Sequence, residues 1–357
     1  MMINIDGSWG EGGGQILRTS VSLATITGQS VRIDRIRANR KKPGLAAQHL
    51  TSVRAAAALC QAQLSGDTLG SMTLEFIPTR PPQAGQYTFD VTEAREGGSA
   101  GAVTLILQTI LLPLAVANGS SKVILKGGTH VPWSPSVTYI EAVYLPTLKR
   151  LGIEAEVKLN AWGWYPQGGG EVELQVTGSK QPFTCLQLLE RGALQQIGGL
   201  AVVTELPAHI PQRMVNRAEN LLQQAHLPAQ IEPVRGRGIA PGAGIFLTAE
   251  YEHSRAGFSG LGSRGIPAER VAETAVQELL DFHAQAAPVD PFLADQLLLP
   301  LALSSDTSQY RVASISKHLT TNAWVIEQFK LANIVIDEEN QLVRVAPKLE
   351  NPADSGI

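Results

Sequence analysis

The sequence predicts an α+β protein with a larger domain and a smaller domain inserted into it. In the N-terminal half, short groups of strands and helices recur at intervals of several tens of residues, which suggests related folding units. From about residue 185 to residue 287 the pattern changes to long amphipathic helices with fewer glycine clusters. With 357 residues, the chain is long enough for two domains. We therefore expect residues 1–184 and 288–357 to form the larger domain and residues 185–287 the smaller one.

The N-terminal segment predicts a strand, a glycine turn and a helix. Ile3 and Ile5 alternate with polar residues, and apolar residues recur at helical spacing from Leu17 until Gly28. Between them, five glycines lie within eight residues around Glu11. Such a turn can present N–H groups to an anion, and its carboxylate can hold a divalent metal or a proton. The alternative is a tight structural connection, and the spacing matches neither the P-loop nor the dinucleotide motif.

The other predicted elements follow from apolar periodicity and turn residues. We expect strands at residues 30–37, 72–78, 86–91, 122–126, 153–159, 171–176 and 310–313, and helices at residues 45–64, 100–117, 137–151, 216–226 and 267–284, with a last helix that opens within residues 314–322 and runs to residue 329. A second glycine triplet at 168–170 is interpreted as structural, and the glycines at 257–262 as an exposed loop. The last ten residues are polar and are expected to fray.

Composition and charge limit the function classes. Apolar residues make up 44% of the chain, and the net charge of −3 excludes a strong non-specific DNA-binding protein. Cys60 and Cys185 lie far apart, with Cys60 on the buried face of a predicted helix, so we expect no disulfide and a reducing cytoplasm. The start of the chain does not resemble a signal peptide, and the most apolar segment, residues 103–117, is too short to span a bilayer. We interpret that segment as a buried helix.

A group of basic residues follows the first helix. Six cations accompany a single acid, Asp34, between residues 32 and 42: Arg32, Arg35, Arg37, Arg40, Lys41 and Lys42. If residues 30–37 form a strand, Arg35 and Arg37 lie on one face while Ile36 packs inward. A guanidinium group can donate two hydrogen bonds to the oxygens of one phosphate, so this basic segment can hold an RNA end. The alternative is a solvated strand edge. His49 follows nearby, where it can also serve as a helix-start residue with a satisfied hydrogen bond.

Near the C-terminus, two further segments are candidates for chemistry. Residues 292–296 place Asp295 and Gln296 directly before an apolar run, a boundary typical of pocket edges. His318 lies at the start of a predicted helix, where the helix dipole lowers the pKa of the imidazole and favours a neutral nucleophile or base. The alternative for His318 is a surface or capping role.

Taken together, these segments resemble motifs of the RNA 3′-terminal phosphate cyclase family. Eight motifs match in family order: GEGGGQILR at 10–18, the segment 37–40, KPGL at 42–45, QHL at 48–50, LQT at 107–109, GGT at 127–129, ADQL at 294–297, and HL at 318–319 with TN at 321–322. A single motif would be weak evidence. Eight in order across most of the chain make coincidence implausible.

The resemblance implies a fold and a reaction. The fold is a larger domain of three related units, each a small sheet with two helices, and an inserted smaller α/β domain. The reaction is the ATP-dependent conversion of an RNA 3′-terminal phosphate to a 2′,3′-cyclic phosphodiester, with release of AMP and pyrophosphate. ATP, a divalent metal (Mg²⁺ or Mn²⁺) and an RNA with a 3′-phosphate end are the expected ligands. We expect no membrane association and a cytoplasmic location.

The resemblance also assigns roles to individual residues. His318 corresponds to the nucleophile that attacks the α-phosphorus of ATP and forms histidinyl-AMP. Glu11 corresponds to the metal-associated carboxylate. Four residues are expected to line the RNA phosphate site: Arg18, Arg37, Arg40 and His49. Seven residues are expected to form the nucleotide pocket: Gln108, Pro135, Phe292, Leu293, Ala294, Asp295 and Gln296. The adenine is expected to lie between Pro135 and Phe292.

Two other functions remain as alternatives. A non-catalytic relative with this fold can act as an RNA-binding factor in ribosome maturation, but such a protein is expected to lack the nucleophilic histidine, and His318 is present. An enolpyruvyl transferase is built from similar units, but the HLTTN segment and the Asp-Gln pair fit nucleotidyl transfer better. The sequence leaves open the RNA substrate, the preferred metal, and whether the chain is a monomer or a homodimer.

Overall fold

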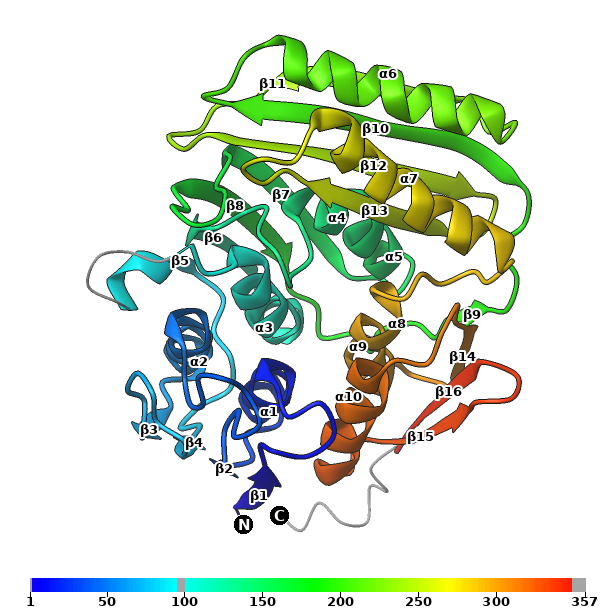
Figure 1. Ribbon diagram of the computed structural model, residues 1–357. Coiled ribbons are helices and arrows are strands. Elements are labelled where there is room, and N and C mark those ends of the chain that lie inside the picture. The colour runs from blue at the N-terminus through cyan, green and yellow to red at the C-terminus, as the bar shows by residue number, and fades with distance from the viewer. Residues whose placement is uncertain (1, 95–99, 349–357) are drawn as a thin grey trace.

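The computed structural model describes residues 2–94 and 100–348 and has a mixed α/β fold. Four small sheets, each of four strands with mixed parallel and antiparallel pairs, are covered by helices (Figure 1). This architecture is consistent with the predicted α+β class. The expected fraying of the last ten residues concerns mainly residues 349–357, which lie outside the described residues.

The first sheet contains the N-terminal strand and the predicted glycine turn. Its strand order is β1-β2-β4-β3, with β1 parallel to β2 and the other neighbours antiparallel. The strands are β1 (Ile3–Asp6), β2 (Val31–Asp34), β3 (Gln63–Ser65) and β4 (Leu74–Ile77), and the helices are α1 (Gly14–Thr27) and α2 (Ala47–Cys60). The predicted order of strand, turn and helix is confirmed, and Gly28 ends α1 with φ 71°. The helix expected to reach residue 64 ends at Cys60, since Gln61 adopts a left-handed φ of 49° and β3 follows.

The second sheet repeats that strand order as β5-β6-β8-β7, with β5 parallel to β6. Its strands are β5 (Gln86–Asp90), β6 (Ser120–Gly127), β7 (Glu154–Ala161) and β8 (Gly170–Thr177), and a short 3₁₀ helix, η1 (Val91–Ala94), follows β5. The apolar helix α3 (Val103–Val116) is buried, as predicted. The helix expected at 137–151 is divided into α4 (Val137–Tyr139), a π-helical turn η2 (Ile140–Tyr144) and α5 (Leu145–Lys149). Pro146 has no N–H to continue a regular α-helical ladder, which accounts for an irregularity at this point.

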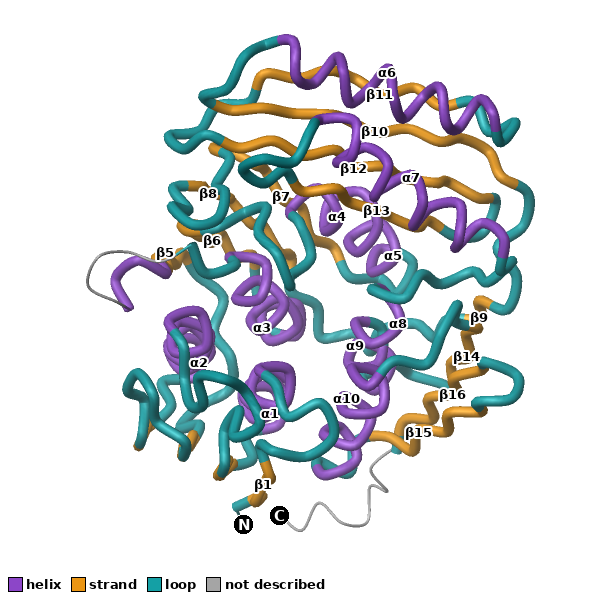
Figure 2. Tube along the Cα trace, in the orientation of Figure 1, coloured by secondary structure: helices purple, strands orange, loops and turns teal. Residues whose placement is uncertain are grey.

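The third sheet lies at the C-terminal end of the described chain, in the order β9-β14-β16-β15. Its members are β9 (Gln187–Leu188), β14 (Ser308–Arg311), β15 (Ala332–Asp337) and β16 (Leu342–Pro347), with helices α8 (Leu293–Gln296), α9 (Leu298–Ala302) and α10 (Lys317–Gln328). Again the first pair, β9 and β14, is parallel and the others are antiparallel. The helices of the first and third sheets meet, because α1 packs against α10 (Figure 2). This contact brings the glycine turn next to the start of α10.

The fourth sheet, β11-β10-β12-β13, is formed by residues between β9 and β14. Its strands are β10 (Leu194–Thr204), β11 (Ala229–Arg235), β12 (Gly242–Tyr251) and β13 (Arg255–Leu261), and helices α6 (His209–Gln224) and α7 (Ala268–Ala284) cover one face (Figure 1). The prediction of α7 is confirmed, α6 was predicted in part, and the four strands were not predicted. The prediction of an exposed loop at 257–262 is wrong: residues to Leu261 belong to β13, and Phe258 is 2% exposed. Position 257 of this strand is a glycine because a Cβ there would lie 2.7 Å from the ring of Tyr139.

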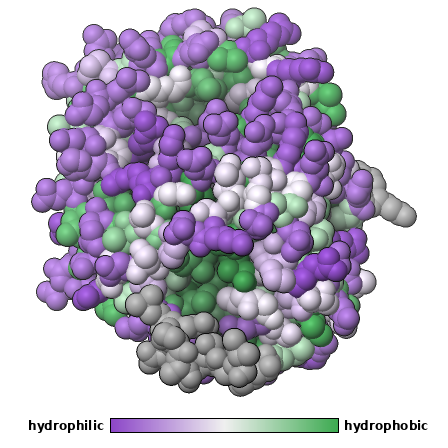
Figure 3. All heavy atoms as spheres, turned by 180° about the vertical axis from the view of Figure 1, so that it is seen from behind, coloured by the Kyte–Doolittle hydropathy of each residue, from purple (hydrophilic) through white to green (hydrophobic). Residues whose placement is uncertain are grey.

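Two hydrophobic cores correspond to this arrangement. The larger core joins the helices of the first three sheets, and a second core between the fourth sheet, α6 and α7 contains residues 197–287 together with Ala313. Cys60 is buried as predicted, and both Cys60 and Cys185 are free thiols. Seen from behind, the surface is mostly hydrophilic, with an apolar area in its lower half (Figure 3). Every helix in the described parts of the chain is too short or too polar to cross a membrane.

Candidate active site

The glycine turn is clamped to α10. The backbone N–H of Glu11 donates a 2.9 Å hydrogen bond to Oγ1 of Thr321. Gly10 has a φ of 56°, and a Cβ at this position would lie 2.4 Å from the same Thr321 oxygen. Trp9 also stacks on Trp324 of α10, with ring centroids 4.6 Å apart. The turn therefore requires glycine for both its conformation and its close approach to the helix.

The imidazole of His318 is oriented by a side chain from α1. His318 is the second residue of α10, whose start is capped by the Ser316 hydroxyl accepting from Leu319 N at 3.2 Å. Its Nδ1 lies 2.6 Å from Oε1 of Gln15, and the Gln15 amide donates to the carboxylate of Asp295. With its NH₂ group directed at Asp295, Gln15 offers an acceptor to His318, so Nδ1 carries the proton. The lone pair of Nε2 is then free to attack an electrophile.

The surroundings favour the neutral form of His318, although its side chain is 54% exposed. Burial lowers the pKa of His318, and the cations of Arg18 and Arg40 lower it further, while Asp295 acts in the opposite direction. Burial likewise raises the pKa of Asp295, against the influence of His318, Gln15 and Arg18. The predicted position at a helix start is confirmed. The main cause of the lowered pKa is burial, whereas the sequence argument relied on the helix dipole.

Arg18 and His49 form a cationic and donor surface beside the turn. A Cβ on Gly14 would lie 2.2 Å from Nε2 of His49 and 2.9 Å from Nη1 of Arg18, so both side chains close over this glycine. Nδ1 of His49 accepts a 3.2 Å hydrogen bond from Ala46 N, which leaves the proton on Nε2. Burial, with Arg18 and Arg37 nearby, lowers the pKa of His49 well below its ordinary value. His49 is therefore both a helix-start residue and a neutral donor toward the turn.

The structure corrects the predicted basic face. Ile36 packs inward as expected, but Arg35 and Arg37 adopt φ values of 54° and 53°, so they lie in a turn and not on one strand face. Arg35 pairs with Asp6, and Arg32 pairs with Asp34 and Glu75. Because Arg32 and Arg35 are paired with these acids, the six basic residues do not form a single surface.

Two of the predicted arginines remain near the turn. Arg40 forms an ion pair with Oε1 of Glu11, although its side chain is 44% exposed. Arg37 donates a 2.7 Å hydrogen bond to the carbonyl of Gly44, and its burial lowers its pKa. Burial also lowers the pKa of Arg18, to about 10, against the influence of Asp295. Arg18 and Arg40 are the two arginines whose charges lower the pKa of His318.

Glu11 has the features of a metal-associated carboxylate. Its Oε2 is buried without a hydrogen-bond partner and lies 3.5 Å from Nδ1 of His318. Among the described residues, no group of three or more His, Cys, Asp and Glu side chains is placed to hold a metal. Mg²⁺ commonly uses one or two carboxylates together with substrate phosphates and water, and a single unsatisfied carboxylate oxygen fits that type of site. The residues present therefore fit a divalent ion shared with a phosphate.

Five of the residues predicted for the nucleotide lie on α8, which packs against α10, and on α3. Asp295 is fixed from two sides, because its carboxylate binds Gln15 and its carbonyl accepts a 2.7 Å hydrogen bond from Nδ2 of Asn322. Nε2 of Gln108 donates a 2.6 Å hydrogen bond to Oε1 of Gln296. Leu293 and Ala294 are buried and contribute packing and backbone.

The two residues expected on either side of the adenine belong to neighbouring loops. Phe292 is 48% exposed, and its ring meets Tyr139 edge to face at 6.2 Å. The carbonyl of Pro135 accepts a 2.8 Å hydrogen bond from the hydroxyl of Thr104. Pro135 lies two residues before the start of α4. The Phe292 ring therefore meets Tyr139 of α4, the helix into which the Pro135 loop leads.

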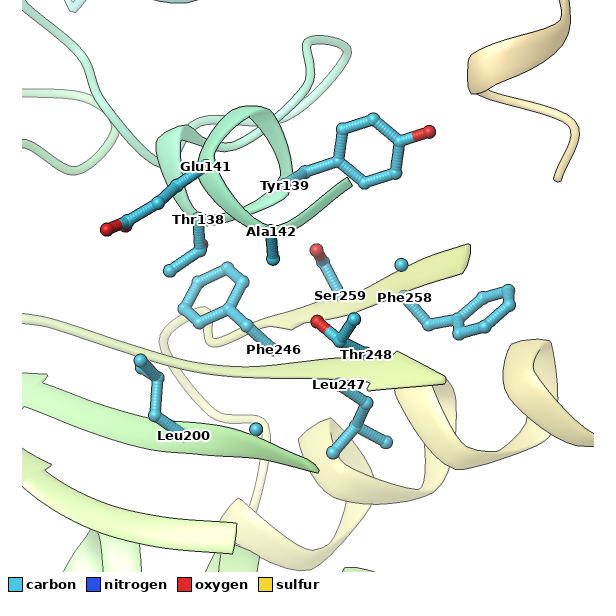
Figure 4. Close-up of a pocket in the computed structure, with 12 residues that line it drawn as sticks. Thr138, Tyr139, Glu141, Ala142, Leu200, Phe246, Leu247, Thr248, Phe258 and Ser259 are labelled. Atoms are coloured by element: carbon cyan, nitrogen blue, oxygen red, sulfur yellow. The ribbon is translucent and has the colours of Figure 1, made fainter. Parts of the chain in front are cut away.

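Two cavities lie in this region. One, of about 60 Å³, is lined by Gln15, Arg18, Thr19, Ser22, Gln108, Leu112, Tyr144, Asp295, Gln296, Leu299 and Asn322. Ligand pockets typically have volumes of about 300–1,000 Å³, so this cavity alone does not hold a nucleotide. A larger cavity of about 320 Å³ separates α4 and η2 from the fourth sheet. Figure 4 shows Thr248 and Ser259 among the side chains that line it, and none of the predicted site residues does so.

Several residues of this site were missed as functional by the sequence reasoning. Gln15, Thr321 and Asn322 were noted only as parts of motifs, yet they connect the turn, His318 and Asp295. Asp290 and Tyr139 were not considered. A polar residue inside an apolar helix face, such as Gln15 at 6% exposure, was the available signal.

Comparison with known proteins gives the family of this chain. A family model described as "RNA 3'-terminal phosphate cyclase" matches residues 9–336. The chain belongs to the RNA 3′-terminal phosphate cyclase family. Relatives named RNA 3'-terminal phosphate cyclase include one from Gloeothece citriformis, 65% identical over 97% of this chain and 99% of its own length. Another, from Nostoc punctiforme, is 66% identical over 96% of this chain and 99% of its own length. A third, from Thermococcus gammatolerans, is 41% identical over 98% of this chain and 99% of its own length. The cyclase family match spans the glycine turn, α8 and α10, the three elements that form the site.

Proposed function

We propose that this protein is an ATP-dependent RNA 3′-terminal phosphate cyclase that acts through a histidinyl-AMP intermediate on His318. The main support is the hydrogen-bonded series from His318 through Gln15 to Asp295, because it leaves Nε2 of a neutral imidazole unprotonated. A neutral imidazole is a good nucleophile, and its phosphoramidate is reactive enough to transfer AMP onward. The names of the relatives support the RNA substrate class.

Three bond exchanges make up the proposed reaction. First, Nε2 of His318 attacks the α-phosphorus of ATP, a nitrogen–phosphorus bond forms, and pyrophosphate leaves. Next, an oxygen of the RNA 3′-phosphate attacks that phosphorus, and the bond to His318 breaks. Finally, the adjacent ribose 2′-hydroxyl attacks the activated RNA phosphorus, loses its proton to solvent and expels AMP. The product is the 2′,3′-cyclic phosphodiester, and His318 is regenerated.

The neighbouring side chains have distinct roles in this proposal. Arg18, Arg37, Arg40 and the Nε2–H of His49 would bind the RNA phosphate, since cations and neutral donors stabilise phosphoryl oxygens that gain charge. The nucleotide would be bound by Gln108, Gln296, Asp295 and backbone of α8, with its base between Pro135 and Phe292. A divalent ion on Glu11 would polarise a phosphoryl oxygen. For a base to enter, the Gln108–Gln296 hydrogen bond must be exchanged for contacts with the nucleotide.

We also propose three related units with one insertion. The support is a shared strand order, β1-β2-β4-β3, β5-β6-β8-β7 and β9-β14-β16-β15, each with one parallel pair at the start. The fourth sheet follows β9 and precedes β14 in the chain. We therefore place the start of the inserted domain between Leu188 and Leu194, because β9 pairs with β14 of the larger domain.

The alternative of a non-catalytic RNA-binding factor is disfavoured by the oriented histidine. The decisive experiment is incubation of the purified protein with α-labelled ATP and Mg²⁺ or Mn²⁺, followed by detection of labelled protein. We expect an acid-labile adduct in the wild type and in His253→Ala, a control histidine whose side chain is 52% exposed. We expect none in His318→Ala. An unlabelled wild type that still binds ATP would exclude the covalent mechanism and favour the binding factor.

A further inference from the structure

Trp133 is the most exposed large apolar side chain among the described residues. Its exposure is 93%, compared with 80% for Ile239 and 64% for Tyr165. Its φ is 63°, a left-handed value that is rare for a bulky residue. Conformations of this kind persist where the surrounding structure holds them, and they concentrate at ligand sites. Both the side chain and the backbone of Trp133 are thus in states that folding alone does not favour.

The loop that carries Trp133 is anchored at both ends. Val131 is 5% exposed and accepts a 3.1 Å hydrogen bond from the Ser134 hydroxyl through its carbonyl. Ser136 is 6% exposed, and its hydroxyl caps α4 by accepting from Tyr139 N at 3.1 Å. Pro132 and Pro135 flank the tryptophan and restrict the backbone further. The indole is therefore presented outward from a fixed loop.

A buried hydroxyl–imidazole network supports the same loop from below. Thr138 donates to the Ser136 hydroxyl at 3.1 Å and lies 2.9 Å from Nε2 of His130. His130 is 1% exposed, and its burial lowers its pKa well below the ordinary value. Its ring stacks on Trp162 at 4.1 Å. Because His130 is neutral, the segment from residue 127 to residue 140 contains no charged side chain.

The chemistry of this loop selects one kind of contact. A loop without charge has no cation for a phosphate, so its exposed indole contributes a flat apolar face and a single N–H donor. Stacking on aromatic side chains is how single-stranded nucleic acids are held with little sequence preference. Trp133 lies two residues before Pro135, the expected neighbour of the adenine.

We propose that Trp133 is a stacking surface for a nucleobase at the mouth of the nucleotide pocket. The inference rests on the proposed cyclase function, because that function places an ATP and an RNA end in this region. The base can come from the RNA strand or from ATP. The RNA is the favoured source, since Pro135 and Phe292 are already the expected partners of the adenine.

The test compares Trp133→Ala and Trp133→Phe with the wild-type chain. The probe is a fluorescent ten-nucleotide RNA with a 3′-phosphate, titrated by anisotropy at one salt concentration, and a second series titrates ATP alone. Ile239→Ala is the matched control for an exposed apolar side chain on another loop. Thermal unfolding of each variant checks that the fold is intact. We expect no change for Trp133, because a side chain that is 93% exposed contributes little to the stability of the fold.

We expect Trp133→Ala to weaken RNA binding by about fivefold to a hundredfold, with Trp133→Phe close to wild type and Ile239→Ala unchanged. RNAs with an abasic site at successive 3′ positions identify the stacked nucleotide. At that position the losses of binding free energy caused by Trp133→Ala and by removal of the base are not additive, because both remove the same contact. A loss confined to the ATP series would assign the stacked base to ATP instead of RNA.

Equal RNA and ATP affinities in all variants would overturn the inference. The inference would also be overturned if Trp133→Ala changed the apparent size of the protein in gel filtration but not its affinity for RNA or ATP. The indole would then contact a second copy of the chain. Failure of the proposed function is detected separately: it appears as a wild type that forms no labelled adduct, whatever its affinity for RNA.

Discussion

The phenol of Tyr139 donates a hydrogen bond to the carboxylate of Asp290, at 2.9 Å from Oδ1 and 3.1 Å from Oδ2. The same carboxylate accepts from the backbone N–H groups of Phe292 and Leu293, each at 2.8 Å, and of Gly257 at 3.2 Å. Asp290 is fully buried. It therefore joins the π-helical region, the fourth sheet and the loop that presents the expected adenine contact, Phe292.

Replacing Asp290 by Asn tests this connection. The amide cannot accept from all these donors, so we expect a loss of about 1–3 kcal/mol in unfolding free energy and weaker ATP binding. Denaturant unfolding and ATP titration measure the two effects. Asp306→Asn, at an exposed turn, is the control. Wild-type ATP affinity in Asp290→Asn would show that this carboxylate does not position the nucleotide loop.

The same carboxylate predicts a pH dependence of stability. Burial raises the pKa of Asp290 from 3.8 to about 6, so the folded state binds more protons than the unfolded state between these values. The stabilising contribution of the protonated group is complete below pH 4 and is lost as the pH rises through 6, by about 3 kcal/mol in total. The difference in unfolding free energy between wild type and Asp290→Asn should fall over this pH interval. A difference independent of pH would contradict the raised pKa.

Gln15 is expected to affect chemistry more than binding. Without its acceptor, the His318 ring loses the contact that fixes its tautomer and direction, and misplacement of a reacting group costs about a hundredfold in rate. We therefore expect Gln15→Ala to slow self-adenylation by about this factor while RNA affinity stays within twofold. Pre-steady-state labelling measures the rate, with the exposed Gln63→Ala as control. An unchanged labelling rate would contradict the orienting role.

The acid limb of adenylation should lie below the ordinary histidine value of 6.5, because burial and the nearby arginines lower the pKa of His318. The nucleophile is the neutral form, so the rate falls only when the pH drops through this lowered pKa. Asp295→Asn removes the charge that opposes the shift and should move the limb to still lower pH. Labelling rates between pH 4.5 and 8 provide the measurement. A shift to higher pH in Asp295→Asn would contradict the assigned electrostatics.

Gly14 is predicted to tolerate no side chain. A Cβ there would lie 2.2 Å from Nε2 of His49, so Gly14→Ala should displace His49 and Arg18 and weaken RNA binding by at least about tenfold. Gly198→Ala is the control, because its Cβ would meet only ordinary contacts at 3.4 Å and beyond. RNA titration of the folded variants measures the effect. If Gly14→Ala binds RNA like the control, the surface formed by Arg18 and His49 does not hold the RNA end.

The sequence by itself determined the α+β class, the glycine turn followed by α1, the buried helix α3 and the helix start at His318. These features depend on local conformational preference and on apolar periodicity, which are written in consecutive residues. The basic face was predicted wrongly, since whether Arg35 and Arg37 share a side depends on backbone angles that no residue type specifies. The strands of the fourth sheet were also missed. Their glycines and glutamines, as in β10, are weak strand formers that pair because neighbouring strands and α6 cover them.

Only the tertiary structure decided how the candidate site is assembled. Gln15 lies 280 positions from Asp295 and 303 positions from His318 along the chain, and their contact exists because α1 packs against α10 and α8 against α10. The proton on Nδ1 of His318, the neutral state of His49 and the raised pKa of Asp290 all follow from burial and from specific partners. Such properties belong to an environment of distant residues, so a linear sequence contains the groups but not their protonation or direction.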